Sequence, residues 1–177
     1  MVQKIKRSLI PELVPGPLWG RSAARMLGQR AVWKKHIRAD ALAEADNKCA
    51  FCGSHENGFI CHDKWQYNDA QGIATLIGFE IHCRKCDAVT HVGQAIMRNQ
   101  SREDREEVLR EVLIHLCKVN QCSHESGMQI LSKAMDEWTK RSKKKWTVEV
   151  TPALVKRYPD LSALPDFFPG PRTTVGR

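Results

Sequence analysis

Apolar residues recur at helical spacing over three long stretches of the chain. From 22 to about 46 they return at steps of three and four residues, and Gly28 is expected to break this helical segment in two. Ser101 is a good N-cap, so a helix is predicted over 101–120, followed by another over 123–141. These two helices are expected to pack as an antiparallel pair. The apolar side of the second helix comprises Met128, Leu131, Met135 and Trp138.

Strand patterns precede these two helices. Residues 59–65 and 73–82 are rich in β-branched and aromatic side chains, and 67–72 contain the polar and glycine residues of a turn, so a hairpin is predicted. A further short strand is expected over 146–150. Together the patterns predict an α+β fold, with a small β-hairpin module packed on surrounding α-helices.

Proline and glycine set off both ends of the chain. Residues 1–20 predict an extended N-terminal arm, and 21–150 a single domain. Over 151–177 we expect a short helix, which begins with Thr151 as cap and proline at its first position. A proline-rich tail follows it, and this tail either packs in extended form or is mobile.

Charge and hydropathy narrow the class of protein. The 177 residues carry a formal net charge of +8 with a pI near 9.3, which favours an acidic partner, most simply nucleic acid. No apolar run approaches the roughly 18 residues that a membrane span requires, and the first residues lack the apolar core of a secretory signal. We therefore expect a cytoplasmic protein without membrane association.

Two Cys-x-x-Cys pairs are the strongest chemical signal. Cys49 and Cys52 precede the predicted hairpin, and Cys83 and Cys86 follow it, a spacing typical of four thiolates around one structural zinc ion. The alternative is two disulfides. It requires an oxidising compartment, and the chain's seven cysteines cannot all pair. The sequence thus predicts a four-cysteine zinc site.

A second set of candidate ligands follows the last cysteine of these pairs. Asp87 is a good N-cap for a helix predicted over 87–97, and His91 lies four residues later on the same helix face. Either residue also has a purely structural interpretation, Asp87 as the helix cap and His91 as a surface residue or a zinc ligand. His82, next to Cys83, is interpreted as a structural or supporting group, and Glu80 as a strand residue.

This arrangement resembles the HNH endonuclease family. The matching residues are Cys61-His62-Asp63 on the first strand and Asp87-x-x-x-His91 on the helix, within the four-cysteine framework. The segment from His62 to Tyr67, which reads His-Asp-Lys-Trp-Gln-Tyr, and the Cys83–Gly93 ending are similar to those of bacterial and phage HNH-like zinc proteins. The resemblance implies a treble-clef, ββα-metal module.

The resemblance also implies roles for individual residues. His62 would be the general base that deprotonates a water, since a neutral imidazole can take a proton near neutral pH. Asp87 and His91, together with Cys61, would hold a catalytic Mg, Mn or Zn ion against the scissile phosphate. A histidine on a strand can equally be a structural residue, so His62 has that alternative.

Two functions follow from these patterns. The first is metal-dependent hydrolysis of phosphodiester bonds, with DNA favoured over RNA. The second is a catalytically inactive zinc module that binds nucleic acid or protein as an adaptor in a larger complex. In both, basic side chains are expected to contact phosphate groups. These are Arg84, Lys85, Lys143, Lys144 and Lys145.

Overall fold

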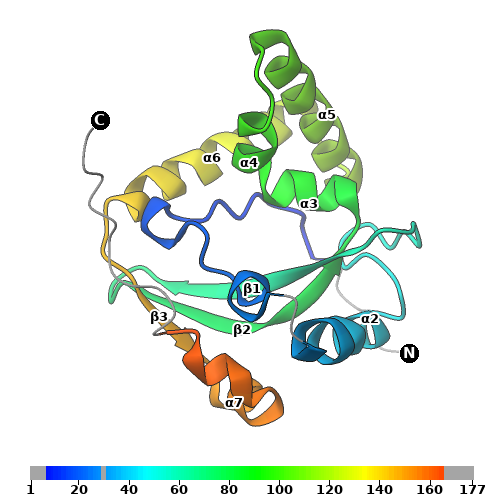
Figure 1. Cartoon of the computed structure of the whole chain (residues 1–177). Coiled ribbons are helices and arrows are strands. Elements are labelled where there is room, and N and C mark those ends of the chain that lie inside the picture. The colour runs from blue at the N-terminus through cyan, green and yellow to red at the C-terminus, as the bar shows by residue number, and fades with distance from the viewer. Residues whose placement is uncertain (1–6, 29–30, 166–177) are drawn as a thin grey trace.

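The computed structural model describes residues 7–28 and 31–165 and has a three-stranded sheet with helices on both faces (Figure 1). Strands β1 (Ile60–Asn68) and β2 (Ile73–His82) form the predicted hairpin, and β3 (Thr147–Val150) extends it in the order β1-β2-β3. β1 is antiparallel to β2, and its register places His62 opposite Glu80. β3 is parallel to β2, with Thr147 opposite Ile73. The fold is therefore of mixed α and β type.

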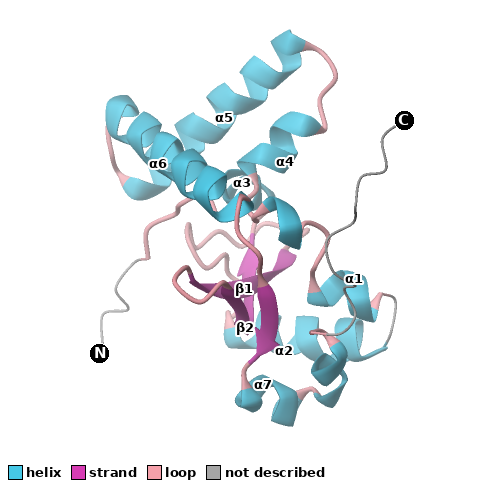
Figure 2. Ribbon diagram, turned by 90° about the vertical axis from the view of Figure 1, so that its left-hand side faces the viewer, coloured by secondary structure: helices cyan, strands magenta, loops and turns pink. Residues whose placement is uncertain are grey.

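Four helices cover one face of the sheet (Figures 1 and 2). They are α3 (Arg84–Thr90), α4 (Val92–Met97), α5 (Arg102–Asn120) and α6 (His124–Ser142). Their buried side chains, among them Val89, Val92 and Leu116, form one hydrophobic cluster with the cysteines and with Phe51. This cluster joins the predicted zinc site directly to the helical layer.

Short helices and turns cover the opposite face. They are α1 (Ala23–Leu27), the π-helical turn η2 (Val32–Ile37), α2 (Arg38–Glu44), α7 (Pro152–Arg157) and the 3₁₀ turn η3 (Pro159–Ala163). With Ala74, Leu76 and Val148 of the sheet they form a second hydrophobic cluster. The sheet thus has a buried core on each side.

Serine caps set the limits of the two long helices. Ser101 and Ser123 each accept a hydrogen bond from the backbone N–H three residues later, and α5 ends at Gln121 in the left-handed conformation. The predicted antiparallel pair is present, but its contact face differs from the expected one. Of the predicted stripe on α6, Leu131 is buried, whereas Met128 and Met135 are 46% and 47% exposed.

The N-terminal arm, described from Arg7 onward, runs between the helical layer and the sheet (Figure 1). The Asn120 side chain binds both backbone groups of Leu9, and the Trp138 indole donates to the carbonyl of Val14. The arm is extended as predicted, apart from the 3₁₀ turn η1 (Gly16–Leu18). It therefore acts as an internal strap that contacts both long helices.

The C-terminal segment departs from the prediction. The short helix α7 lies where it was expected, but residues after Pro159 form the turn η3, in which Leu161 is fully buried. Leu164 is also fully buried, so apolar packing holds this part of the tail in a helical turn. Residues 166–177 lie outside the described residues.

Within the described ranges, the helices are all too short or too polar to cross a membrane.

Candidate metal centres

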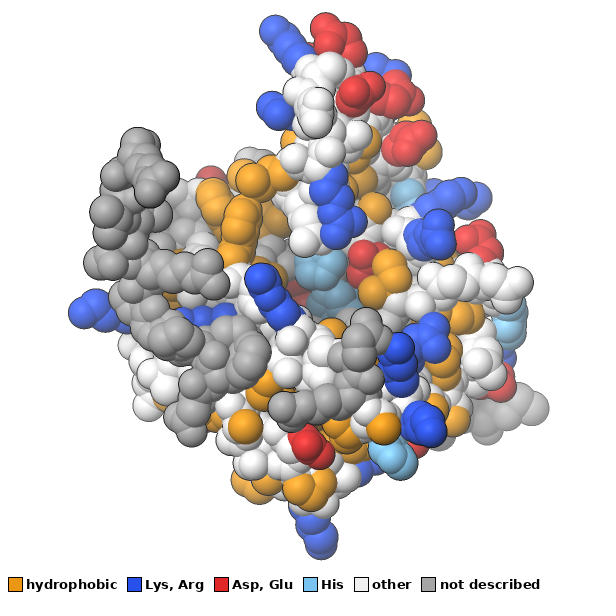
Figure 3. All heavy atoms as spheres, in the orientation of Figure 1, with side chains coloured by type: hydrophobic (Ala, Val, Ile, Leu, Met, Phe, Trp, Pro, Cys, Tyr) orange, Lys and Arg blue, Asp and Glu red, His pale blue; other side chains and the backbone are white. Residues whose placement is uncertain are grey.

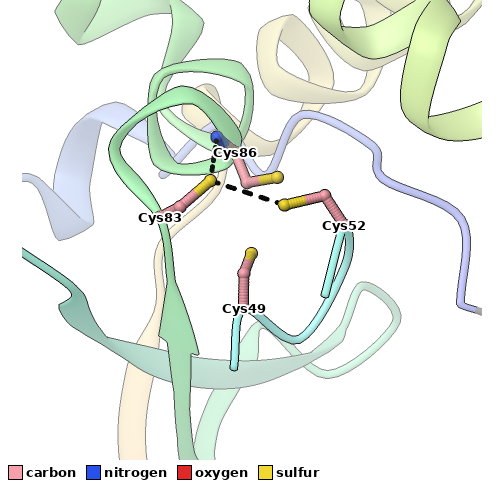
Figure 4. Close-up of side chains that lie close together, drawn as sticks. All are labelled: Cys49, Cys52, Cys83 and Cys86. Carbon is pink, nitrogen blue, oxygen red and sulfur yellow. Dashed lines mark hydrogen bonds between the residues drawn. The ribbon is translucent and has the colours of Figure 1, made fainter. Parts of the chain in front are cut away.

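The two Cys-x-x-Cys pairs meet at the junction of the sheet and the helical layer (Figure 4). The sulfur atoms of Cys49, Cys52, Cys83 and Cys86 all lie within 4.8 Å of one another. Cys49 and Cys52 lie in a turn closed by Gly53, whose φ of 72° favours glycine. Cys83 follows β2 directly, and Cys86 lies on α3. The chain therefore supplies these thiols from two tight turns, as the spacing predicts.

The sulfur geometry fits a metal ion rather than disulfides. All seven cysteines are free thiols, and the Sγ atoms of Cys52 and Cys83 lie 3.6 Å apart. A disulfide requires about 2.05 Å between sulfurs, whereas two thiolates on a tetrahedral zinc ion lie about 3.8 Å apart. A hydrogen bond from Cys86 lowers the pKa of Cys49 to about 4, and the pKa of Cys86 is raised by the same contact. The donor set suits zinc.

Neighbouring groups orient these sulfurs. Cys83 is the N-cap of α3, and its Sγ accepts a hydrogen bond from the backbone N–H of Cys86 at 3.5 Å. His115 of α5 places its Nε2 3.2 Å from the Cys86 sulfur. Because the sulfur of Cys86 contacts His115, the four-cysteine site is coupled to α5.

A second candidate centre lies on the face of the hairpin that is covered by α3, α4, α5 and α6. His62 of β1 lies close to Glu80 and His82 of β2, to Asp87 of α3, and to His91, which joins the end of α3 to the start of α4. Two groups of possible ligands share His62, one with Glu80 and His82 and one with Asp87 and His91, and within each the ligand atoms lie less than 4.8 Å apart. The structure thus brings His62, Asp87 and His91 together, as the resemblance implied.

The histidine rings of this centre are closely packed. His62 lies between the other two, with ring centroids 4.5 Å from His82 and 4.7 Å from His91. His62 is 7% exposed and His82 is fully buried. Three buried atoms here have no hydrogen-bond partner among the described residues, namely Nδ1 of His62, Nδ1 of His82 and Oδ1 of Asp87.

Burial disfavours charge on the groups of this centre. Burial first, then the charges of His82 and His91, lower the pKa of His62 to about 3. Burial also lowers the pKa of His91, against the opposing effect of Asp87, and raises the pKa of Asp87. Neutral imidazoles are the form that binds metal ions, so these histidines are in the ligating state at neutral pH.

An ion-pair chain connects the centre to the N-terminal arm. The Nε2 atom of His82 lies 3.1 Å from Oε1 of Glu80, and the other carboxylate oxygen accepts from Arg7 at 2.7 Å. Arg7 also donates to Glu12 at 2.7 Å. The Phe51 ring packs against His82 and beneath Arg7, which places this chain beside the cysteine turn.

Two sequence-based interpretations of this centre are wrong. Cys61 was expected beside Asp87 and His91, but side chains alternate along a strand and Cys61 therefore packs in the cluster on the opposite face. Burial there raises the pKa of its thiol to about 12. Asp87 was interpreted as the cap of one helix over 87–97, but α3 begins at Arg84 with Cys83 as its cap, and the predicted helix is divided at His91 into α3 and α4. The Asp87 carboxylate is therefore not needed as a cap.

Glu80, His82 and His115 are the site residues that the sequence pattern did not identify. His115 lies among the buried positions of α5, and its position in the sequence does not indicate that it contacts the cysteine site. Glu80 and His82 were considered only as a strand residue and a supporting group. The hairpin register offered the missing signal, because pairing His62 with Glu80 puts His82 on the same face two residues away.

The predicted phosphate-binding residues are mostly exposed. Arg84 and Lys85 lie on the first turn of α3, and Lys143 and Lys145 follow α6. Lys144 is engaged within the fold, since its Nζ donates to the backbone carbonyl of Asp69 at 2.6 Å. The face in Figure 3 is hollowed at its centre, where histidine side chains lie between basic and acidic groups.

Comparison of the chain with protein-family profiles, curated proteins and solved structures finds no significant match to any of them.

Proposed function

We propose that the chain is a zinc-containing nuclease of the HNH type, which hydrolyses phosphodiester bonds in DNA with a divalent metal ion. The observation that carries the proposal is the group formed by His62, Asp87 and His91, which β1 and α3 bring together from positions up to 29 residues apart. Imidazole and carboxylate donors together suit Mn²⁺, Zn²⁺ or, through the carboxylate, Mg²⁺.

The order of elements supports the assignment to a treble-clef, ββα-metal module. A cysteine turn, a hairpin, a second cysteine pair and a helix follow one another, and α3 packs against both strands of the hairpin. The backbone N–H of Ala50 in the first turn donates to the carbonyl of Ile81, which joins that turn to β2 at 2.8 Å. The four-cysteine zinc site would then fix α3, which carries Asp87 and leads directly into His91.

In this proposal His62, Asp87 and His91 bind the metal ion, and exposed basic residues bind the substrate. His62 becomes a metal ligand instead of the general base expected from the sequence, because it is 7% exposed and its Nδ1 atom lies among other ligand atoms. A bound divalent ion supplies Lewis-acid stabilisation of the phosphate and lowers the pKa of a water molecule. Asp87 and His91 would hold this ion together with His62.

Exposed basic residues near both ends of the hairpin could contact the DNA backbone. Arg84 and Lys85 lie on the first turn of α3, beside the four-cysteine site, whereas Lys143 and Lys145 lie near the hairpin turn, to which Lys144 is bonded. About six strand residues separate His62 from that turn, which corresponds to about 20 Å. A duplex of about six base pairs spans this distance, so the two basic groups can contact phosphates about six base pairs apart on one substrate.

A nicking assay on supercoiled plasmid tests the proposal. We expect cleavage with Mn²⁺, Mg²⁺ or Zn²⁺, none after chelation, and a loss of at least about 100-fold in Asp87→Asn and His91→Ala. Asp136→Asn, an exposed carboxylate on α6, is the matched control and should cleave like the wild type. Cleavage that persists in both site variants would contradict the proposal.

The second candidate is an adaptor that binds nucleic acid without cutting it. The low exposure of His62 favours this function, because it limits the access of water and substrate to the centre. In that case binding should weaken steeply with salt, and Lys143→Ala and Lys145→Ala should each lower the slope of log K against log salt by about 1. His91→Ala should leave binding unchanged, with no cleavage by any variant.

A further inference from the structure

The environment of His82 is unusual for a histidine without a ligand. The side chain is fully buried, and its Nε2 atom contacts Oε1 of Glu80 at 3.1 Å. A carboxylate on Nε2 favours the tautomer with the proton there, which leaves the lone pair on Nδ1. That Nδ1 atom has no hydrogen-bond partner and lies 3.9 Å from Oδ1 of Asp87, which has none either.

His62 contributes the third unpartnered atom, also an Nδ1. These three atoms come from β1, β2 and α3. Nδ1 of His82 lies 3.9 Å from Oδ1 of Asp87, and His62 shares one group of possible ligands with His82 and another with Asp87. A buried polar atom without a partner carries a desolvation penalty, and proteins rarely keep three of them together. A cation among these lone pairs and the carboxylate oxygen would satisfy all three at once.

The distances between the rings fit ligands of one ion. An imidazole bound at about 2.1 Å has its centroid about 3.2 Å from the ion, so two rings at angles of 90 to 110° lie about 4.5 to 5.2 Å apart. The observed centroid separations are 4.5 Å for His62 and His82 and 4.7 Å for His62 and His91. Both printed separations are compatible with a common ion, but the His62 and His82 rings are stacked at an interplanar angle of 21°, so one ring has to turn for both lone pairs to face the ion.

We propose that His82 is a ligand of the divalent ion through Nδ1, together with His62 and Asp87, and that Glu80 positions His82 for it. This proposal rests on the metal centre of the proposed function but not on DNA cleavage. It adds a ligand from β2 to a group that otherwise comes from β1 and α3, and so makes the hairpin register part of the metal site.

Glu80 acts through His82 rather than on the ion. One of its oxygens contacts His82, and the other accepts from Arg7, so the carboxylate is satisfied by its neighbours. Arg7 is held in turn by Glu12. A carboxylate that accepts the N–H of a ligating histidine fixes the tautomer and ring orientation and strengthens the ligand. The alternative, with Glu80 itself on the ion, requires His82 to ligate through Nε2.

Cobalt binding tests the ligand set. Protein with zinc retained in the cysteine site is titrated with Co²⁺, and the visible absorption of the bound cobalt is followed. We expect one Co²⁺ per chain in the wild type, a loss of affinity of at least about 100-fold in His82→Gln and a loss of about 10- to 100-fold in Glu80→Gln. Glu12→Gln also removes a carboxylate charge, but at a residue that contacts Arg7, one contact further from His82 than Glu80 is. The cobalt affinity of this variant should stay within about twofold of that of the wild type.

The ligating nitrogen gives a readout independent of affinity. In the wild-type protein loaded with Cd²⁺, long-range ¹H–¹⁵N spectra should show His82 with its proton on Nε2 and the metal on Nδ1. Metal on Nε2, no ion beyond the cysteine site, or unchanged cobalt affinity and spectrum in Glu80→Gln would each overturn the proposal. If His82→Gln does not fold, the cobalt affinity of Glu80→Gln and the ¹H–¹⁵N spectra of the wild-type protein still test the proposal. Tight Co²⁺ binding without DNA cleavage would refute the nuclease function alone.

Discussion

At the scale of single residues, Asn120 holds a segment that has no regular structure of its own. Its Oδ1 accepts from the N–H of Leu9 at 2.8 Å, and its Nδ2 donates to the carbonyl of Leu9 at 2.7 Å. Leu9 is fully buried, so its backbone groups would be left without partners if this amide were removed. Asn120 therefore joins the arm to α5, in addition to the bonds of the arm to Thr90 and Trp138.

Asn120→Ala should lower the free energy of unfolding by about 1 to 3 kcal/mol, because it orphans two backbone groups in a partly buried place. Urea denaturation followed by tryptophan fluorescence measures the change. Lys118→Ala, an exposed position on the same helix, should stay within about 0.5 kcal/mol of the wild type. A denaturation midpoint that Asn120→Ala leaves unchanged would show that the arm is held by other contacts.

The backbone conformation at position 72, in the hairpin turn, requires glycine. Its φ is 66°, and a Cβ there would lie 2.5 Å from the backbone oxygen of Lys145. We expect Gly72→Ala to cost about 2 to 4 kcal/mol, since the left-handed conformation and a backbone clash add together. Gly78→Ala is the matched control, because nothing lies within 4 Å of a Cβ at that position. Thermal denaturation of the two variants side by side makes the comparison, and equal losses in both would contradict this prediction.

At the scale of elements, an ion pair joins the hairpin turn to the end of α6. Arg141 donates to both carboxylate oxygens of Asp69, at 2.8 to 3.1 Å, and Lys144 approaches the same residue. The hydrogen bond from Arg141 lowers the pKa of Asp69. The carboxylate therefore adds stability above its unfolded-state pKa of about 4, and this stability is lost as the pH falls through the folded-state pKa.

Asp69→Asn should accordingly destabilise the protein at pH 7 by only about 0.2 to 1 kcal/mol, because the Asp69 side chain is 44% exposed. The difference between variant and wild type should shrink below pH 4 and in high salt. Denaturant titrations at pH 7 and pH 3 check this. A difference that grows as the pH falls would mean that the ion pair is not its source.

Local patterns predicted the elements themselves, but not how they pair and pack. Ser101 and Ser123 lie next to the helices that they cap, so their signals could be recognised directly. The parallel pairing of β3 with β2 joins segments about 70 residues apart, and no local pattern encodes it. Met128 and Met135 share the helical spacing of Leu131, yet only tertiary packing decides that Leu131 is the buried one.

The same division between local pattern and tertiary packing holds for the two candidate metal centres. The four-cysteine spacing was sufficient because each Cys-x-x-Cys pair is local and its chemistry is restricted to few uses. His62, Asp87 and His91 could be proposed from a resemblance, but the roles of Cys61 and Asp87 depended on the strand face and the true start of α3. His115 could not have been found, because only the packing of α5 brings it to Cys86.

At the scale of the whole molecule, the four-cysteine site joins the hairpin to the helical layer. Its ligands come from the turn before β1, the end of β2 and the first turn of α3, and His115 extends the contact to α5. The helical layer and the opposite layer have separate hydrophobic clusters, with the sheet between them. Only the first of these clusters includes the four cysteines of the candidate zinc site.

Loss of zinc should therefore loosen the helical layer first. Cys86→Ser should cost several kcal/mol, because structural zinc contributes on the order of 10 kcal/mol to the folding of small zinc domains. We expect hydrogen exchange to rise earliest in α3 and α5, while β3 and α7 stay protected by the second cluster. Cys122→Ser lies outside the ligand set and should keep both the zinc and the protection. If Cys86→Ser kept full protection in α3 and α5, apolar packing alone would hold α3 on the sheet, and the position of Asp87 and His91 would not depend on the cysteine site.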